Sequence, residues 1–175
     1  RPVWQASGGR GSSPVSVVLI SGATLSSLPW ANPDRENFFT SRLAFYNEVI
    51  IGRKFNEYFS MQVAPIMVHR NLVQFADEEN DMYALGIGSR LKLSKRIALV
   101  VDYHYLAYGI DRTKFKDPLS IGLDIETGGH VFQLHFSNST GMNEKAFLTS
   151  TTDRWGNGDI RFGFNLSRVF TVGKR

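Results

Sequence analysis

The stretch MYALGIGSRLKLS, residues 82–94, decides the fold because its side chains alternate in character with a period of two. One set is apolar and consists of Tyr83, Leu85, Ile87, Leu91 and Leu93. The intervening set is small or basic and consists of Ala84, Gly86, Gly88, Arg90 and Lys92. Successive side chains of a β-strand point to opposite faces, so the stretch predicts a strand with one apolar and one polar face.

The same alternation recurs along the chain and predicts eight strands, at about residues 14–27, 40–55, 58–73, 82–94, 97–108, 118–127, 130–140 and 158–170. Most of these strands are longer than those of soluble proteins and fit the roughly nine to eleven residues that a transmembrane strand needs. No useful stretch has helical periodicity, and no apolar run approaches the roughly 18 residues of a transmembrane helix. The sequence predicts a single all-β domain over residues 1–175.

The predicted connections are alternately short and long. Short turns are expected at 56–57, 95–96 and 128–129, and a fourth short connection precedes the first full strand. Long polar loops cover 28–39, 74–81, 109–118 and 142–158. Short turns at one end and long loops at the other are typical of an antiparallel, up-and-down transmembrane β-barrel.

The polar face favours a membrane barrel over the alternative of a soluble ligand-binding barrel. A soluble barrel turns its charged face to water, whereas a membrane barrel turns it to the lumen. Glycines and charges of both signs share this face, as expected of a crowded lumen, while the other face is apolar enough to contact lipid. The predicted lumenal polar network consists of Arg42, Glu48, Arg90, Asp102, His104, Asp124, Glu126, His135 and Arg161.

The composition of the chain limits the classes of partner and cofactor that it is expected to bind. The chain has no cysteine, so it has neither disulfides nor a thiolate metal site. Its net charge of +4 is scattered and forms no basic run with interleaved aromatics, so we expect no nucleic-acid partner. The acidic loop at 75–82 does not match the spacing of a calcium-binding loop, and we expect neither a metal nor a cofactor. The expected partners are outer-membrane lipid and other cell-envelope proteins.

Three longer stretches support this interpretation by resemblance. FFTSRLAFYNEVIIGRKFNEYFSMQVAPIMVHRNLV (38–73), DIETGGHVFQLHFSNS (124–139) and WGNGDIRFGFNLSRVFTV (155–172) resemble a Bacteroidota family of outer-membrane β-barrels of unknown function. The resemblance covers residues 14–172 and implies the outer membrane of a Gram-negative bacterium. It carries over no catalytic residues.

Closure of the barrel leaves two alternatives. Members of the resembled family look longer at the N-terminus, and residues 1–13 have the pattern of a partial strand followed by a periplasmic turn. A barrel in lipid must close, because an open edge leaves backbone groups without hydrogen-bond partners. Either the eight strands close alone, or the chain is the C-terminal part of a larger, even-stranded barrel. We favour the second alternative.

His135 and Ser137 raise the alternative of an enzyme. They lie two residues apart, on one face of a strand, in a motif that resembles outer-membrane acyl hydrolases. Those enzymes place both groups toward lipid, whereas the phase of this strand places them in the lumen. The position that would supply a third group to orient the histidine holds Thr149. We therefore expect His135 to join Asp124 or Glu126 in the polar network, in a non-enzymatic pore, scaffold or subunit of a cell-envelope complex.

Overall fold

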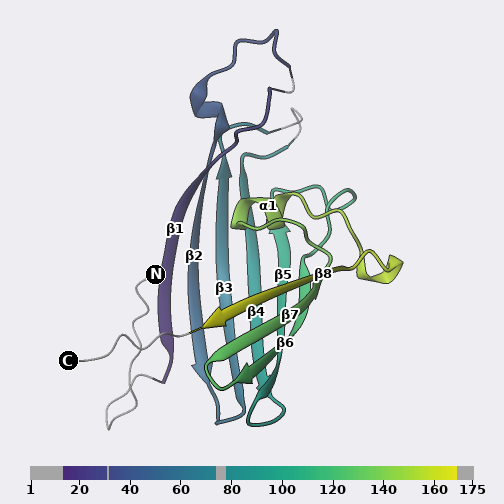
Figure 1. The fold of residues 1–175 in the computed structure, drawn as a ribbon. Coiled ribbons are helices and arrows are strands. Elements are labelled where there is room, and N and C mark those ends of the chain that lie inside the picture. Colours follow the sequence, from purple (N-terminus) through teal and green to yellow (C-terminus); the bar gives the residue numbers. More distant parts are fainter. Residues whose placement is uncertain (1–13, 31, 74–77, 169–175) are drawn as a thin grey trace, which may run out of the picture.

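The computed structural model describes residues 14–30, 32–73 and 78–168, which form one antiparallel sheet (Figure 1). The strands follow one another in chain order as β1 (Ser16–Leu25), β2 (Leu43–Lys54), β3 (Phe59–Arg70), β4 (Asp81–Lys92), β5 (Ile97–Tyr108), β6 (Leu119–Thr127), β7 (His130–Ser137) and β8 (Arg161–Arg168). The predicted all-β class and the eight antiparallel strands are confirmed. The expected partial strand and turn at 1–13 lie outside the described residues.

The short turns are closed by local hydrogen bonds. Between β2 and β3, Asn56 Oδ1 accepts from the backbone N–H groups of Tyr58 and Phe59, each at 2.8 Å. Between β6 and β7, Gly128 and Gly129 have φ of 54° and 113°, and two positive φ values in succession are what a two-residue type I′ hairpin turn requires. These turns fix the register, which in turn decides which side chains share a face.

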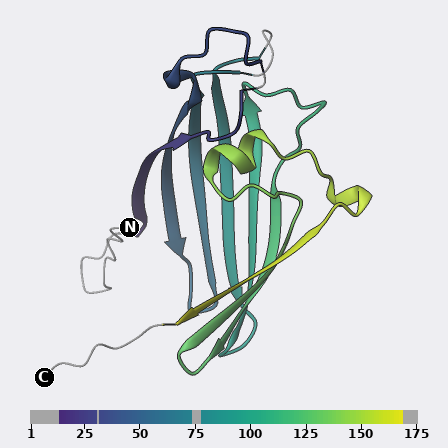
Figure 2. The ribbon, with the colours of Figure 1, turned by 45° about the horizontal axis from the view of Figure 1, so that its top comes forward.

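The sheet curls into a half-barrel rather than a closed cylinder (Figures 1 and 2). β6 to β8 swing round in front of the middle strands, while β1 stands at the opposite margin. The pairing runs from β1 to β8 without a ladder between these two strands among the described residues. Within the described ranges, both edges of the half-barrel therefore lack a neighbouring strand. No helix in the described part of the chain is long and apolar enough to span a membrane.

The two faces of the half-barrel differ as the alternation predicts. The outward face exposes large apolar side chains along its strands, including Leu19, Phe45, Leu85, Tyr105, Phe132 and Phe164. The concave face carries Gln62, Arg90, Asp102, Asp124 and Gln133, which line one common cavity. Apolar groups outside and polar groups inside are the reverse of a soluble barrel and the arrangement of a membrane barrel.

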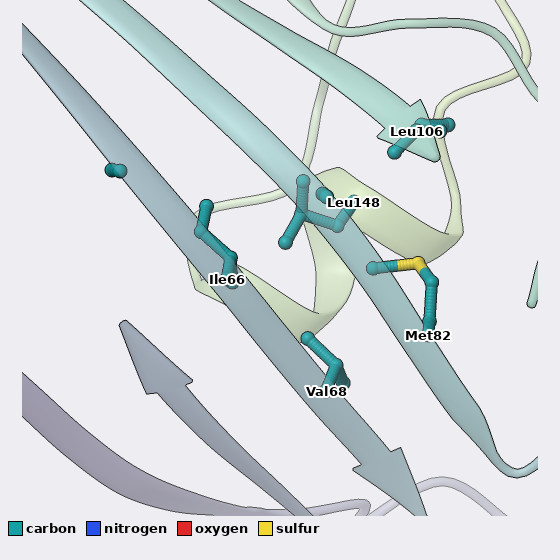
Figure 3. Packing of buried hydrophobic residues seen from close by; sticks show 7 residues of the cluster. Ile66, Val68, Met82, Leu106 and Leu148 are labelled. Atoms are coloured by element: carbon teal, nitrogen blue, oxygen red, sulfur yellow. The ribbon is translucent and has the colours of Figure 1, made fainter. Parts of the chain in front are cut away.

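The concave face also has an apolar part, which was not predicted from the sequence. Near the long loops, its inward positions are Ala64, Ile66, Val68, Met82, Ala84 and Leu106. They are covered by α1 (Glu144–Thr149), a helix in the β7–β8 connection that the sequence analysis did not predict (Figures 1 and 3). Two 3-10 segments, η1 (Phe39–Arg42) and η2 (Trp155–Asn157), complete the elements. The concave face is thus polar toward the short turns and apolar where α1 covers it.

Candidate functional site

The polar part of the lumen is organised by one carboxylate. Arg90 Nε on β4 donates to Asp124 Oδ2 on β6 at 3.2 Å, and Gln133 Nε2 on β7 donates to Asp124 Oδ1 at 3.0 Å. Arg90 reaches Asp124 across β5, where Ala98 stands opposite Asp124 in the register. Because Ala98 has a short side chain, it leaves the path across β5 open. The surrounding cavity has a volume of about 1000 Å³. It is an open polar chamber with charges of both signs.

A second polar pair lies higher on the concave face, next to α1. Asp102 Oδ2 is 3.5 Å from Nδ1 of His104, and His104 is buried. The edge of the His104 ring meets Phe147 of α1 with centroids 4.8 Å apart. Gly86 on β4 stands opposite His104 of β5 in the register, and a Cβ added there would lie 3.0 Å from His104 Nε2. A glycine at that position therefore gives the imidazole the space to contact the helix.

α1 is held in place by its own cap and by burial. Asn143 Oδ1 accepts from Ala146 N at 2.8 Å, which satisfies one of the free N–H groups of the first turn. Leu148 is 0% exposed and packs among the apolar side chains of β3, β4 and β5 (Figure 3). A helix of six residues is not stable alone, so its stability comes from this packing. We refer to α1 with the buried Leu148 and the contacting Phe147 as the plug.

The predicted polar network is dispersed in the structure. It brings Arg90 to Asp124 and Asp102 to His104, as described above. Arg42 lies at the end of η1, stacked on Trp30, instead of facing the polar chamber. Arg161 pairs with Asp153 of the β7–β8 connection at 2.8 Å. The two remaining acids are separated as well, because Glu126 is exposed beside the β6–β7 turn and Glu48 lines a cavity next to the plug.

His135 and Ser137 lie on the concave face, but His135 does not stand directly opposite the acids expected to contact it. The register places it opposite Gly122 on β6 and Gly163 on β8, whereas Asp124 and Glu126 stand opposite other residues of β7. The register thus places His135 diagonal to Asp124, and none of the described ion pairs or hydrogen bonds joins the histidine to either acid, so the expected partnership stays a prediction.

Ser137 is committed to hydrogen bonds with its neighbours. It is 7% exposed, and its Oγ accepts from Ser120 Oγ at 2.8 Å and from Ser139 N at 3.0 Å. With His135, it borders a small cavity of about 170 Å³ beneath the β7–β8 connection. Within the described ranges, no three His, Asp or Glu side chains come together as a metal site would require.

The residues that were not predicted from the sequence are those of the plug and the apolar side chains of β3, β4 and β5 that pack against it. Ile66, Val68 and Met82 continue the inward phase of strands whose other inward residues are small or polar, and this interruption was a usable signal. Asn143 followed by Glu144 is a typical helix start, and it was the available sign of α1. The contact between His104 and Phe147 has no local signal, because these residues are far apart in the sequence.

Comparison with known proteins agrees with this architecture. A family model described as a membrane bound beta barrel domain (DUF5777) matches residues 1–170. Searches of curated proteins and of solved structures found no match. The match spans the whole curved sheet, and its description agrees with the apolar outward face.

Proposed function

The chain belongs to the DUF5777 family of membrane-bound β-barrel domains, and from this premise we propose that it forms part of a narrow outer-membrane pore closed by the plug. One observation carries the proposal: a polar chamber of about 1000 Å³ ends at an apolar core that a short helix completes. Water and ions occupy polar chambers, whereas a close-packed apolar core excludes them. The structure described above is accordingly the closed state.

The two edge strands of the sheet are evidence that the complete barrel has more than these eight strands. In lipid, every backbone N–H and C=O must find a partner, so β1 and β8 need further strands beside them. The wall is accordingly completed as a larger, even-stranded barrel, of which these strands are a contiguous part.

Location and partners follow from the same proposal. The membrane is the outer membrane of a Gram-negative bacterium, in line with the alternation of short turns and long loops. The resemblance noted above adds a Bacteroidota source. The outward apolar face contacts lipid, and the four long loops offer surfaces to other cell-envelope proteins.

The proposal treats the barrel as non-enzymatic. Two hydrogen bonds already engage Ser137 Oγ as an acceptor, and the register places glycines, not acids, opposite His135. An acyl hydrolase needs an exposed nucleophile and an oriented base. An ester-hydrolysis assay on the Ser137→Ala variant tests this part, because activity that disappears in the variant would establish the enzyme instead.

Single-channel conductance of the complete protein in planar bilayers tests the pore. We expect the wild-type barrel to be mostly closed, with rare openings. Leu148→Asn places an amide in the apolar core, so it should displace the plug and make openings frequent. A wild-type barrel that is permanently open contradicts the closing role of the plug. A barrel that stays silent in both forms contradicts the pore and leaves a scaffold.

A further inference from the structure

A second cavity, at the long-loop end, gathers positive charge from three parts of the chain. Its volume is about 210 Å³, and it is lined by Arg42 at the end of η1, Arg70 at the end of β3 and Lys145 of α1. No acidic side chain is among the described residues that line it. We call it the rim pocket. Cations converging on a small concave space raise its affinity for anions.

The guanidinium of Arg42 is held rigidly at the rim pocket. Its Nη1 donates to the backbone carbonyls of Ser26 at 2.8 Å and Leu28 at 2.7 Å. Its Cζ lies 3.9 Å from the centroid of the Trp30 ring, in a cation–π contact. Because these contacts already order the side chain, an anion that binds beside it loses little further conformational entropy.

Arg70 adds a buried donor that lacks an acceptor. The residue is 8% exposed, its Nη2 donates to Glu79 O at 2.7 Å, and its Nη1 lies 3.7 Å from Glu78 Oε2. Its Nε is buried and has no acceptor in the part of the chain that the structure describes. A buried, charged N–H without an acceptor is unfavourable. Glu78, which lines a neighbouring cavity together with Arg70, offsets the charge of Arg70, so Arg42 and Lys145 supply the net positive charge of the rim pocket.

We propose that the rim pocket binds the phosphate group of a soluble molecule, and that the bound phosphate links the plug to the wall, by which we mean the curved sheet of β1 to β8. Guanidinium and ammonium groups are the side chains that pair best with phosphate oxygens. Lys145 belongs to the plug, whereas Arg70 belongs to the wall, so one anion between them links the two. The pocket is lined by the inward-facing Ala44, which favours a solute of the lumen over a lipid head group outside it. The tie to the plug rests on the proposed function, whereas the binding does not.

Titration with inorganic phosphate tests the binding. The complete protein is folded in detergent, and phosphate is added at constant ionic strength while calorimetry follows the heat of binding. Lys145→Gln removes one charge from the pocket. The matched control is Lys95→Gln, in the exposed β4–β5 turn at the other end of the strands. We expect saturable binding by the wild type and the control, and binding at least roughly tenfold weaker in the Lys145 variant.

The outcomes separate binding, source and coupling. An absence of saturable binding overturns the site, and so does equal binding by the wild type and the Lys145 variant. Arg42→Gln supplies a second variant, expected to weaken binding similarly. Nanodiscs containing an anionic phospholipid test whether the bound phosphate group comes from a soluble molecule or from a lipid. If that lipid competes with free phosphate for the rim pocket, the proposal of a soluble ligand is overturned. Phosphate should slow amide exchange in α1 of the wild type; binding without that slowing overturns the tie to the plug. If the protein binds phosphate but shows no channel conductance, the phosphate site is supported and only the proposed pore is refuted.

Discussion

Removal of the Leu148 side chain should release the plug without unfolding the wall. Leu148 is 0% exposed, and its contacts lie between α1 and the strands rather than within either. A buried Leu→Ala substitution costs about 2–5 kcal/mol, and a value near 3 kcal/mol suits a site that α1 can partly refill. Each 1.4 kcal/mol is a factor of ten, so the undocked population should rise by roughly 100-fold.

Amide hydrogen exchange of the detergent-folded protein measures this change directly. The N–H groups of Phe147 and Ser150 donate to Asn143 O and Ala146 O, each at 3.0 Å, so their exchange reports the docked helix. We expect exchange at these two amides to accelerate by about 100-fold in Leu148→Ala, with the strand amides unchanged. The matched control is Met142→Ala in the same connection, where the side chain is 100% exposed.

Two results would refute this reasoning. If the α1 amides exchange at the wild-type rate in Leu148→Ala, packing of this side chain does not hold the plug. If strand and helix amides accelerate equally, the helix and the wall form one cooperative unit, and the plug has no separate open state. A large effect of the Met142 control would show that the connection responds to any substitution.

Three further substitutions test other parts of the wall. Asn138→Ala removes the three hydrogen bonds of a residue that is 3% exposed. Urea unfolding should show that the free energy of unfolding falls by about 3 kcal/mol. A fall of less than about 0.5 kcal/mol would contradict a structural role for these hydrogen bonds. Gly163→Ala places a Cβ in steric conflict with the His135 ring. We expect a loss of about 1–3 kcal/mol in the same assay, which the added His135→Ala change should relieve. In the β5–β6 loop, hydrogen bonds from the hydroxyl and then the N–H of Thr113 lower the pKa of Asp111. These hydrogen bonds therefore stabilise the loop fully at pH values above the unfolded pKa of about 3.9. The stabilisation is lost as the pH falls through the lower pKa of the folded state. Carboxyl NMR of Thr113→Val should show a higher Asp111 midpoint than the wild type, and equal midpoints would contradict the assignment.

The candidate site divides into features with a sequence signal and features without one. Asp124 was assigned to the lumen from strand phase alone, because alternation fixes the face of every residue once one face is known to be apolar. Its observed contact with Arg90 was not predicted, because Arg90 reaches Asp124 across an intervening strand. Arg42 does not join the polar chamber, because the strand begins one residue later, at Leu43, and the side chain of Arg42 lines the rim pocket instead.

The sequence by itself determined the strands, their order and the two faces, since these follow from a local period of two and from turn residues such as Gly128 and Gly129. Tertiary structure alone decided where the lumen is closed. The apolar residues of α1 have no fixed partner in the sequence, and they become a plug only when the curved sheet brings Val68, Met82 and Leu106 together. The same curvature decided that Arg42, Arg70 and Lys145 share one pocket. Alternation is a local property of the backbone, whereas a socket and a pocket exist only after distant strands have met.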